Sequence, residues 1–235
     1  MKRSILIKLT LLLVAAGTLA AQAAPKAQSN PALEKVLNRM DETAAKFRYA
    51  QADFVWEQFQ SVVKETDTQK GKVYFRRAGR DLQMMADITE PTQKYVLYSD
   101  GKVQVYQPTI DQVTVYTPGK NRADVESFLV LGFGGGGHDL LKSFEVKYEG
   151  IEDVGGVQTA KLDLIPKSPR VHNIFDHIFM WVDPARGVSV QQQVFEPSGD
   201  YRLTKYSDIQ SNQKLPDNIF RLKATGKTKF VTPQG

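Results

Sequence analysis

The strongest constraint on this fold is an alternation of apolar and polar side chains that begins near Gln51 and continues to about Ile209. Successive side chains of a strand point to opposite faces, so this period predicts strands with one apolar and one polar face. The candidate strands are residues 52–63, 70–76, 82–87, 94–99, 102–107, 112–116, 144–149, 157–165, 175–182, 188–196 and 201–209. Tight turns separate most of them, which predicts about eleven strands with antiparallel neighbours.

Two segments depart from the alternation. Apolar residues from Leu33 to Phe47 follow helical spacing after an Asn30-Pro31 cap, which predicts an amphipathic helix. Residues 121–143 predict two short helical pieces around a glycine-rich connection. A sheet of this size curls and must bury one face, so we expect an α+β fold, mainly β: an incomplete antiparallel barrel curved around these helices. The concave side either encloses a cavity or is filled by the helices, and the pattern favours neither.

The N-terminus predicts an export signal. Lys2 and Arg3 precede an apolar stretch, and Ala21-Gln22-Ala23 is a small-x-small cleavage motif, so we expect cleavage after Ala23. Residues 1–23 are then a removed signal peptide and residues 24–235 a single domain. The chain has no cysteine, so neither a lipid anchor nor a disulfide is available. We therefore expect a soluble, periplasmic protein.

The charge of the mature chain argues against nucleic-acid binding. The full sequence has 31 basic and 26 acidic residues. Because Lys2, Arg3 and Lys8 are removed with the signal peptide, the mature chain has 28 basic and 26 acidic residues. The mature part has no cluster of basic residues of the kind that binds phosphates. A nucleic-acid partner is not expected.

The residues also argue against catalysis, a metal or a cofactor. There is no G-x-S-x-G motif and no cysteine, and acidic residues are scattered. Asp176 and His177 are neighbours on a predicted strand and point to opposite faces, so they are poor co-ligands. The Gly134–Gly137 run is not a phosphate loop, because Leu141 stands where a glycine should precede Lys142. We expect a protein that is not an enzyme.

Several short motifs resemble one known family. The stretch from Pro91 through Leu97-Tyr98-Ser99-Asp100-Gly101-Lys102 to Tyr106, Pro108 and Val113 looks like that family's central hairpin. Asp183, Glu196, Gly199, Tyr206, Asp208, Asn212, Leu215-Pro216, Phe220 and Pro233 look like its C-terminal strands and final loop. In order and spacing, the chain resembles the LolA-type periplasmic carriers of outer-membrane lipoproteins.

The resemblance implies a half-open barrel closed by a helical lid, with an apolar cavity that shields acyl chains. It also implies a carrier chaperone that acts as a monomer in outer-membrane biogenesis. Such a carrier receives acylated lipoproteins or lipids from an inner-membrane lipoprotein-releasing transporter and passes them to an outer-membrane acceptor. The residues expected to line the cavity are Leu82, Met84, Leu97, Val105, Phe128 and Leu129.

The resemblance further implies a lid latch, an arginine that binds backbone groups of the lid. The family has an Arg-Pro pair after the second strand, whereas this chain has Arg77-Ala78, and counting back from Pro91 gives Arg80 as the alternative. The expected lid hinge is Gly132 with Gly134, Gly135, Gly136 and Gly137.

The chain also departs from the family pattern, and these departures leave the chemical class of the cargo undetermined. Leu82 and Met84 replace a bulky aromatic pair. A lipoprotein, another lipid and a glycolipid all remain candidates. A periplasmic sensor of mislocalised lipoproteins is an alternative, although such regulators usually have a second C-terminal domain. A hydrolase acting on lipid or cell-wall material is a third.

Overall fold

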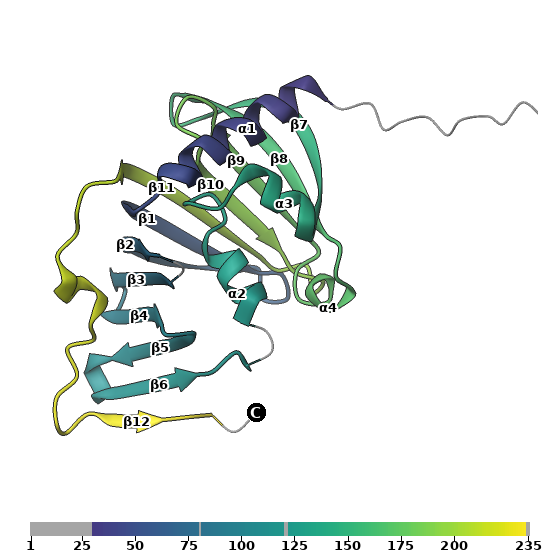
Figure 1. Ribbon diagram of the computed structural model, residues 1–235. Coiled ribbons are helices and arrows are strands. Elements are labelled where there is room, and N and C mark those ends of the chain that lie inside the picture. Colours follow the sequence, from purple (N-terminus) through teal and green to yellow (C-terminus); the bar gives the residue numbers. More distant parts are fainter. Residues whose placement is uncertain (1–29, 80, 120–121, 234–235) are drawn as a thin grey trace, which may run out of the picture.

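The computed structural model describes residues 30–79, 81–119 and 122–233 (Figure 1). The predicted signal peptide and the alternative latch residue Arg80 lie outside this part of the chain. Within it, no helix is long and apolar enough to cross a membrane.

One curled sheet contains all the strands of the described chain (Figure 1). The strands are β1 Tyr49–Gln60, β2 Glu65–Ala78, β3 Asp81–Glu90, β4 Lys94–Ser99, β5 Lys102–Gln107, β6 Gln112–Tyr116, β7 Phe144–Val154, β8 Val157–Pro166, β9 His177–Asp183, β10 Val188–Phe195, β11 Tyr201–Ser211 and β12 Lys229–Val231. Their order is β12-β6-β5-β4-β3-β2-β1-β11-β10-β9-β8-β7. Every predicted strand is present, and the predicted fold class, an incomplete barrel with helices, is confirmed.

Two antiparallel meanders make up this sheet. Strands β1–β6 form one and β7–β11 the other, and they join where β1 pairs with β11 along most of its length. The order leaves β12 and β7 at the two edges, so the described sheet does not close on itself. β12 was not predicted from the alternation, because it is only three residues long and pairs in parallel with β6.

The helices are α1 Pro31–Lys46, α2 Arg122–Leu129, α3 Gly137–Ser143 and the single turn α4 Pro169–His172, with 3-10 turns at Pro108–Ile110 and Asp217–Phe220. The Asn30 side chain caps α1 by accepting the backbone N–H groups of Ala32 and Leu33, as the sequence predicts. α1 and α3 lie against each other on the concave side, and α2 lies farther along the same side (Figure 1). These helices therefore cover the face that the sheet must bury.

Two inner clusters fill the concave side. The first inner cluster packs α1 and α3 on β7–β10 and consists of Val36, Leu37, Met40, Leu131, Leu140, Phe144, Ala160, Leu162, Leu164, Ile178, Met180, Val182 and Val194. The second inner cluster lies on β1–β4 and consists of Phe47, Ala50, Ala52, Phe54, Val73, Phe75, Leu82, Met84, Ile88, Tyr98 and Phe133. Each half of the sheet thus has its own apolar lining.

A third cluster lies on the opposite face of the sheet. Met85 and Leu97 point outward from β3 and β4 and pack with Leu215 and Phe220 of the segment that leads to β12. Figure 1 shows this segment running along one side of the sheet. Arg76 strengthens the contact, because its guanidinium lies 4.5 Å from the centre of the Phe220 ring. Part of the outer face is therefore buried as well.

Replacing Gly137 by alanine should lower the free energy of unfolding by about 1–3 kcal/mol, because the new methyl group would overpack the α1–α3 contact. A Cβ at this position would lie 2.3 Å from the carbonyl oxygen of Leu37. Chemical denaturation of the mature protein measures the change. Gly226→Ala is the control, since its added Cβ meets no atom within 4 Å. Equal stability of both variants would contradict the close packing of α3 on α1.

Candidate functional site

The segment between α2 and α3 lies across the concave face and touches both inner clusters. We call residues 130–137 the lid segment. Leu131 belongs to the first inner cluster and Phe133 to the second. The Phe133 side chain is only 1% exposed and packs between the rings of Phe75 and Tyr206, with centroid distances of 5.3 and 4.8 Å. The lid segment therefore supplies apolar side chains to both halves of the concave face.

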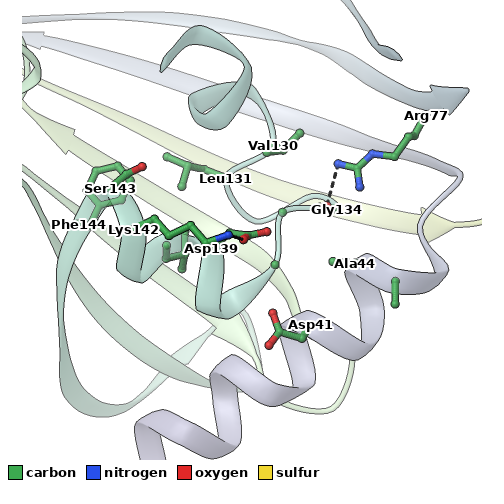
Figure 2. Close-up of a pocket in the computed structure, with 14 residues that line it drawn as sticks. Asp41, Ala44, Arg77, Val130, Leu131, Gly134, Asp139, Lys142, Ser143 and Phe144 are labelled. Carbon is green, nitrogen blue, oxygen red and sulfur yellow. Dashed lines mark hydrogen bonds and ion pairs between the residues drawn. The ribbon is translucent and has the colours of Figure 1, made fainter. Parts of the chain in front are cut away.

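Three hydrogen-bond donors from the sheet hold carbonyl groups of the lid segment. The Gln192 amide donates to the Leu131 carbonyl at 2.6 Å, and the Ser189 backbone N–H donates to the Gly132 carbonyl at 3.0 Å. The Arg77 guanidinium Nη2 donates to the Gly134 carbonyl at 3.0 Å (Figure 2). The first two donors lie on β10 and the third on β2, so the lid segment bridges the two meanders.

Arg77 is also in contact with the end of α1. Its guanidinium carbon lies 5.4 Å from the centre of the Phe47 ring, and its backbone N–H donates to the Arg48 carbonyl. Gly134 has φ of +84°, and a Cβ there would lie 2.4 Å from a Phe47 ring carbon. Arg77 thus contacts the lid backbone as the resemblance implies for the latch. Its action as a latch stays a prediction.

A partly buried hydrogen bond fixes α2 to the sheet. The hydroxyl of Tyr98, whose side chain is fully buried on β4, donates to the Glu126 carboxylate, which also accepts from Arg122 Nε at 2.8 Å. Burial, together with the Glu126 carboxylate, raises the pKa of Tyr98 to about 12. Burial alone would raise the pKa of Glu126, but its hydrogen bonds with Tyr98 and Arg122 outweigh burial and lower it. Glu126 is therefore ionised at neutral pH and holds α2 in place.

An ionic contact fixes α3 to α1. The His138 ring lies between two carboxylates of α1: Nδ1 contacts Asp41, and Nε2 lies 3.3 Å from Glu34. The Asp41 carboxylate also accepts the His138 backbone N–H at 3.2 Å. Hydrogen bonds to Asp41 and then Glu34 raise the pKa of His138. The protonated imidazole is therefore the form that best joins α3 to α1.

Two cavities lie among the helices, and the lid segment lines the first of them. The first, the latch pocket, has a volume of about 520 Å³ and lies between α1, α3 and Arg77 (Figure 2). Its wall is mixed, because Asp41, Asp139 and Lys142 join glycines and apolar residues there. Such a wall suits polar contacts with the lid better than an acyl chain.

The second cavity, the apolar cavity, has a volume of about 550 Å³ and lies between α2, the end of α3 and α4. Its wall consists of Val125, Phe128, Phe144, Val171, Ile174 and Phe175, with Lys142, Ser143, Lys167, Ser168 and Arg170. The Phe128 and Phe175 rings stack at 5.1 Å, and Ile174 is 54% exposed although it is a large apolar residue. An open apolar wall of this size is typical of a small-molecule site.

The structure brings most of the predicted cavity residues to the concave side, at different places. Leu82 and Met84 belong to the second inner cluster, and Leu129 packs against it. Val105 is half-buried and pairs with Val96, which packs on the same cluster. Phe128 lines the apolar cavity.

The prediction that Leu97 lines the cavity is wrong. Leu97 lies in the cluster on the outer face, because the residue beside it, Tyr98, occupies the inner face of β4. The alternation gave no sign of this, since both faces of β4 are buried.

The predicted hinge glycines are closely packed. Gly132 has φ of +80°, and a Cβ there would lie 2.2 Å from the Ser189 Cβ. Gly135 packs on the Val130 carbonyl, Gly136 is the N-cap of α3, and Gly137 begins α3. At these positions glycine is needed for close approach and for left-handed backbone. Their role as a hinge stays a prediction.

Sequence reasoning missed Gln192 and the α4 side of the apolar cavity. Gln192 stands in a run of three glutamines on one strand, and no local signal separates it from its neighbours. Among the described residues, no group of three or more His, Cys, Asp or Glu side chains could hold a metal ion. The His172 and Asp176 side chains, which lie close together in the sequence, approach each other to 3.6 Å.

The fold and the lid define a class of protein: an incomplete barrel whose concave apolar face is covered by a helical insertion. The sequence model of the family described as outer membrane lipoprotein carrier protein LolA matches residues 45–223. The chain belongs to the LolA family. No curated protein sequence matches it.

Solved structures with little sequence similarity share the fold. An uncharacterised conserved protein from Thermus thermophilus is 10% identical, with a TM-score of 0.55 over 86% of this chain and 99% of that one. MucB is 12% identical, with a TM-score of 0.54 over 83% of this chain and 64% of that one. The Pseudomonas aeruginosa MucA/MucB complex gives 13% identity and a TM-score of 0.51, with coverage of 82% and 62%. This chain therefore spans less than two thirds of MucB.

The contact between α3 and α1 should weaken as the pH rises. Because the folded-state pKa of His138 is raised, its stabilising effect is complete below the unfolded value of about 6.5 and is lost as the pH passes the folded value. We expect the Tm difference between wild type and His138→Gln to be largest at pH 5.5 and to shrink by pH 9. A difference that does not change across this range would contradict the role of the imidazolium.

Proposed function

We propose that this protein is a periplasmic, monomeric carrier that shields the acyl chains of lipoproteins and transfers them from the inner to the outer membrane without catalysing a reaction. Membership of the LolA family supports this proposal. The observation that carries it is the lid segment, whose Leu131 and Phe133 side chains occupy an apolar concave face. Acyl chains are chemically equivalent occupants of that face.

In the proposed mechanism, the lid segment leaves the concave face when cargo enters. Opening exposes Leu131 and Phe133, each at a cost of about 1.5–3 kcal/mol, and breaks three hydrogen bonds worth about 0.5–1.5 kcal/mol each. A long acyl chain gains roughly 10 kcal/mol on leaving water, at about 0.8 kcal/mol per CH₂. The cost of lid opening thus offsets much of the free energy gained by one acyl chain. The net affinity stays low enough for the cargo to pass to an acceptor.

The apolar cavity is the proposed starting point for cargo. It is open beside α2, and its Phe128 wall is continuous with the apolar contacts under the lid, because Phe128 also packs on the first inner cluster. Its volume of about 550 Å³ is in the range of a single small-ligand site. Several chains need the additional space that lid opening provides. The proposed partners are an inner-membrane releasing transporter, which delivers the cargo, and an outer-membrane acceptor, which binds it more tightly.

Native mass spectrometry of mature protein from the periplasm, followed by lipid extraction, tests the proposed function. We expect co-purifying acylated proteins or lipids. We also expect delipidated protein to bind a fluorescent fatty acid, and Phe128→Asp to weaken that binding at least about tenfold by placing a charge in the apolar wall. Ile151→Asp, at an exposed position on β7, is the control. The proposed carrier function would be contradicted if the protein co-purifies with no lipid or acylated protein and also fails to bind the fatty acid.

Arg77→Leu should trap cargo. Removing the guanidinium deletes its bond to the Gly134 carbonyl, so the lid closes less readily and bound acyl chains are released more slowly. The measurement is transfer of a labelled lipoprotein from the loaded variant to outer-membrane vesicles. Arg221→Leu makes the same change at an exposed position outside both cavities. Transfer from Arg77→Leu at the wild-type rate would contradict the latch.

A further inference from the structure

The turn between β1 and β2 exposes two adjacent valines. Val62 is 91% exposed and Val63 is 56% exposed. Turns usually have polar residues or glycine at such positions, so two neighbouring branched apolar side chains are unusual here. Residues 64–68 are exposed as well, and most of them belong to the start of β2, so both faces of this end of the hairpin are in water. The hairpin therefore projects from the sheet, and we call its apolar turn, residues 61–64, the hairpin tip.

Hydrogen bonds fix the hairpin tip. The backbone N–H of Ser61 donates to the Asp200 carboxylate at 2.8 Å, and the Ser61 hydroxyl lies 2.8 Å from the same carboxylate oxygen. The Lys64 backbone N–H donates to the Gln60 carbonyl at 2.8 Å and closes the turn. The two valines are thus presented to the solvent by a well-anchored turn.

The hairpin tip lies at the same end of the sheet as the apolar cavity. In the strand register Phe195 of β10 pairs with Tyr201 of β11, which pairs with Phe59 next to the tip. The carbonyl of Phe195 also accepts the backbone N–H of Asp176 at 2.8 Å, two residues after Ile174 of the cavity wall. Ile174 is itself 54% exposed. This end of the sheet therefore combines the cavity with exposed aliphatic side chains.

We propose that the hairpin tip inserts Val62 and Val63 into the headgroup region of a lipid bilayer and so turns the cavity end of the sheet toward the membrane. Each partner in a standard protein interface buries about 800 Å², an area that a projecting turn with two valines cannot supply. A bilayer accepts a small convex apolar tip, and two valines give only weak and reversible binding. Lys64 and Glu65 place one charge of each sign beside the valines, so the contact should be apolar and not electrostatic.

The benefit for cargo transfer rests on the proposed function, whereas membrane binding itself does not. An acyl chain that enters or leaves the apolar cavity at a membrane surface crosses less water than one released into solution. Weak binding also lets a carrier leave one membrane for the other. The two proposals can therefore fail separately.

Flotation of the mature protein with phosphatidylcholine vesicles, with and without phosphatidylglycerol, tests the inference. We expect weak binding to both, little changed by about 0.5 M salt. V62D/V63D should lower the partition coefficient at least about tenfold, because carboxylates resist leaving water, and V62F/V63F should raise it about tenfold through added apolar area. The matched control I110D/I151D changes side chains that are 60% and 58% exposed elsewhere, and it should bind as wild type does.

A dye on the hairpin tip reports insertion directly. The chain has no cysteine, so Val62→Cys accepts a single environment-sensitive label. We expect its emission to shift to shorter wavelength when vesicles are added, and the same label on Ile151→Cys to show no shift.

An unresponsive label at Val62, or flotation that V62D/V63D leaves unchanged, would overturn the inference. Fatty-acid binding by the same protein would then leave the carrier proposal intact. A dimer in sedimentation that V62D/V63D dissociates would also overturn it and would assign the hairpin tip to a contact between two copies of the chain.

Discussion

The insertion of Leu131 and Phe133 into the concave side of the sheet is the interaction on which the rest of this structure depends. The twelve strands of the described chain form one curled sheet with a large apolar face that must be covered. Helix α1 covers one half, and the lid segment reaches across to the other. Three carbonyl groups of that segment are held by donors on both meanders, so the cover is fixed by polar contacts at its backbone and by two side chains in the apolar space.

This arrangement separates two tasks that a carrier must combine. In the proposed carrier, the inner clusters make the closed state stable in water, while the polar contacts around the lid segment would set how readily it leaves. Tyr98 and Glu126 fix α2, and His138 with Asp41 fixes α3, so the segment between them is anchored at both ends. The proposed movement of the lid is therefore expected in the connection itself, where the backbone is left-handed at Gly132 and Gly134.

The sequence predicted the fold far better than it predicted the site. Period-two alternation located the strands because most of them bury only one face, and Asn30-Pro31 located the start of α1. The alternation could not correct the placement of Leu97, because both faces of β4 are covered, one of them by a C-terminal segment more than a hundred residues away. The contact between Arg77 and the lid followed from family resemblance. The contact of Gln192 did not, since a glutamine on a strand carries no local signal of its partner. The apolar cavity joins Phe128 to Phe175 across 46 intervening residues, and only the folded chain brings them together.

Hydrogen exchange of the lid-segment amides with and without cargo tests the central claim most directly. In the closed state the amides of Phe133 and Gly135 donate to the Val130 carbonyl, and that of Ser189 donates to Gly132. If acyl chains take the place of Leu131 and Phe133, saturation with a synthetic triacylated peptide should speed exchange at all three amides while the β1–β2 amides stay protected. Exchange at the three amides that is unchanged or slower with the peptide bound would contradict displacement of the lid segment by cargo.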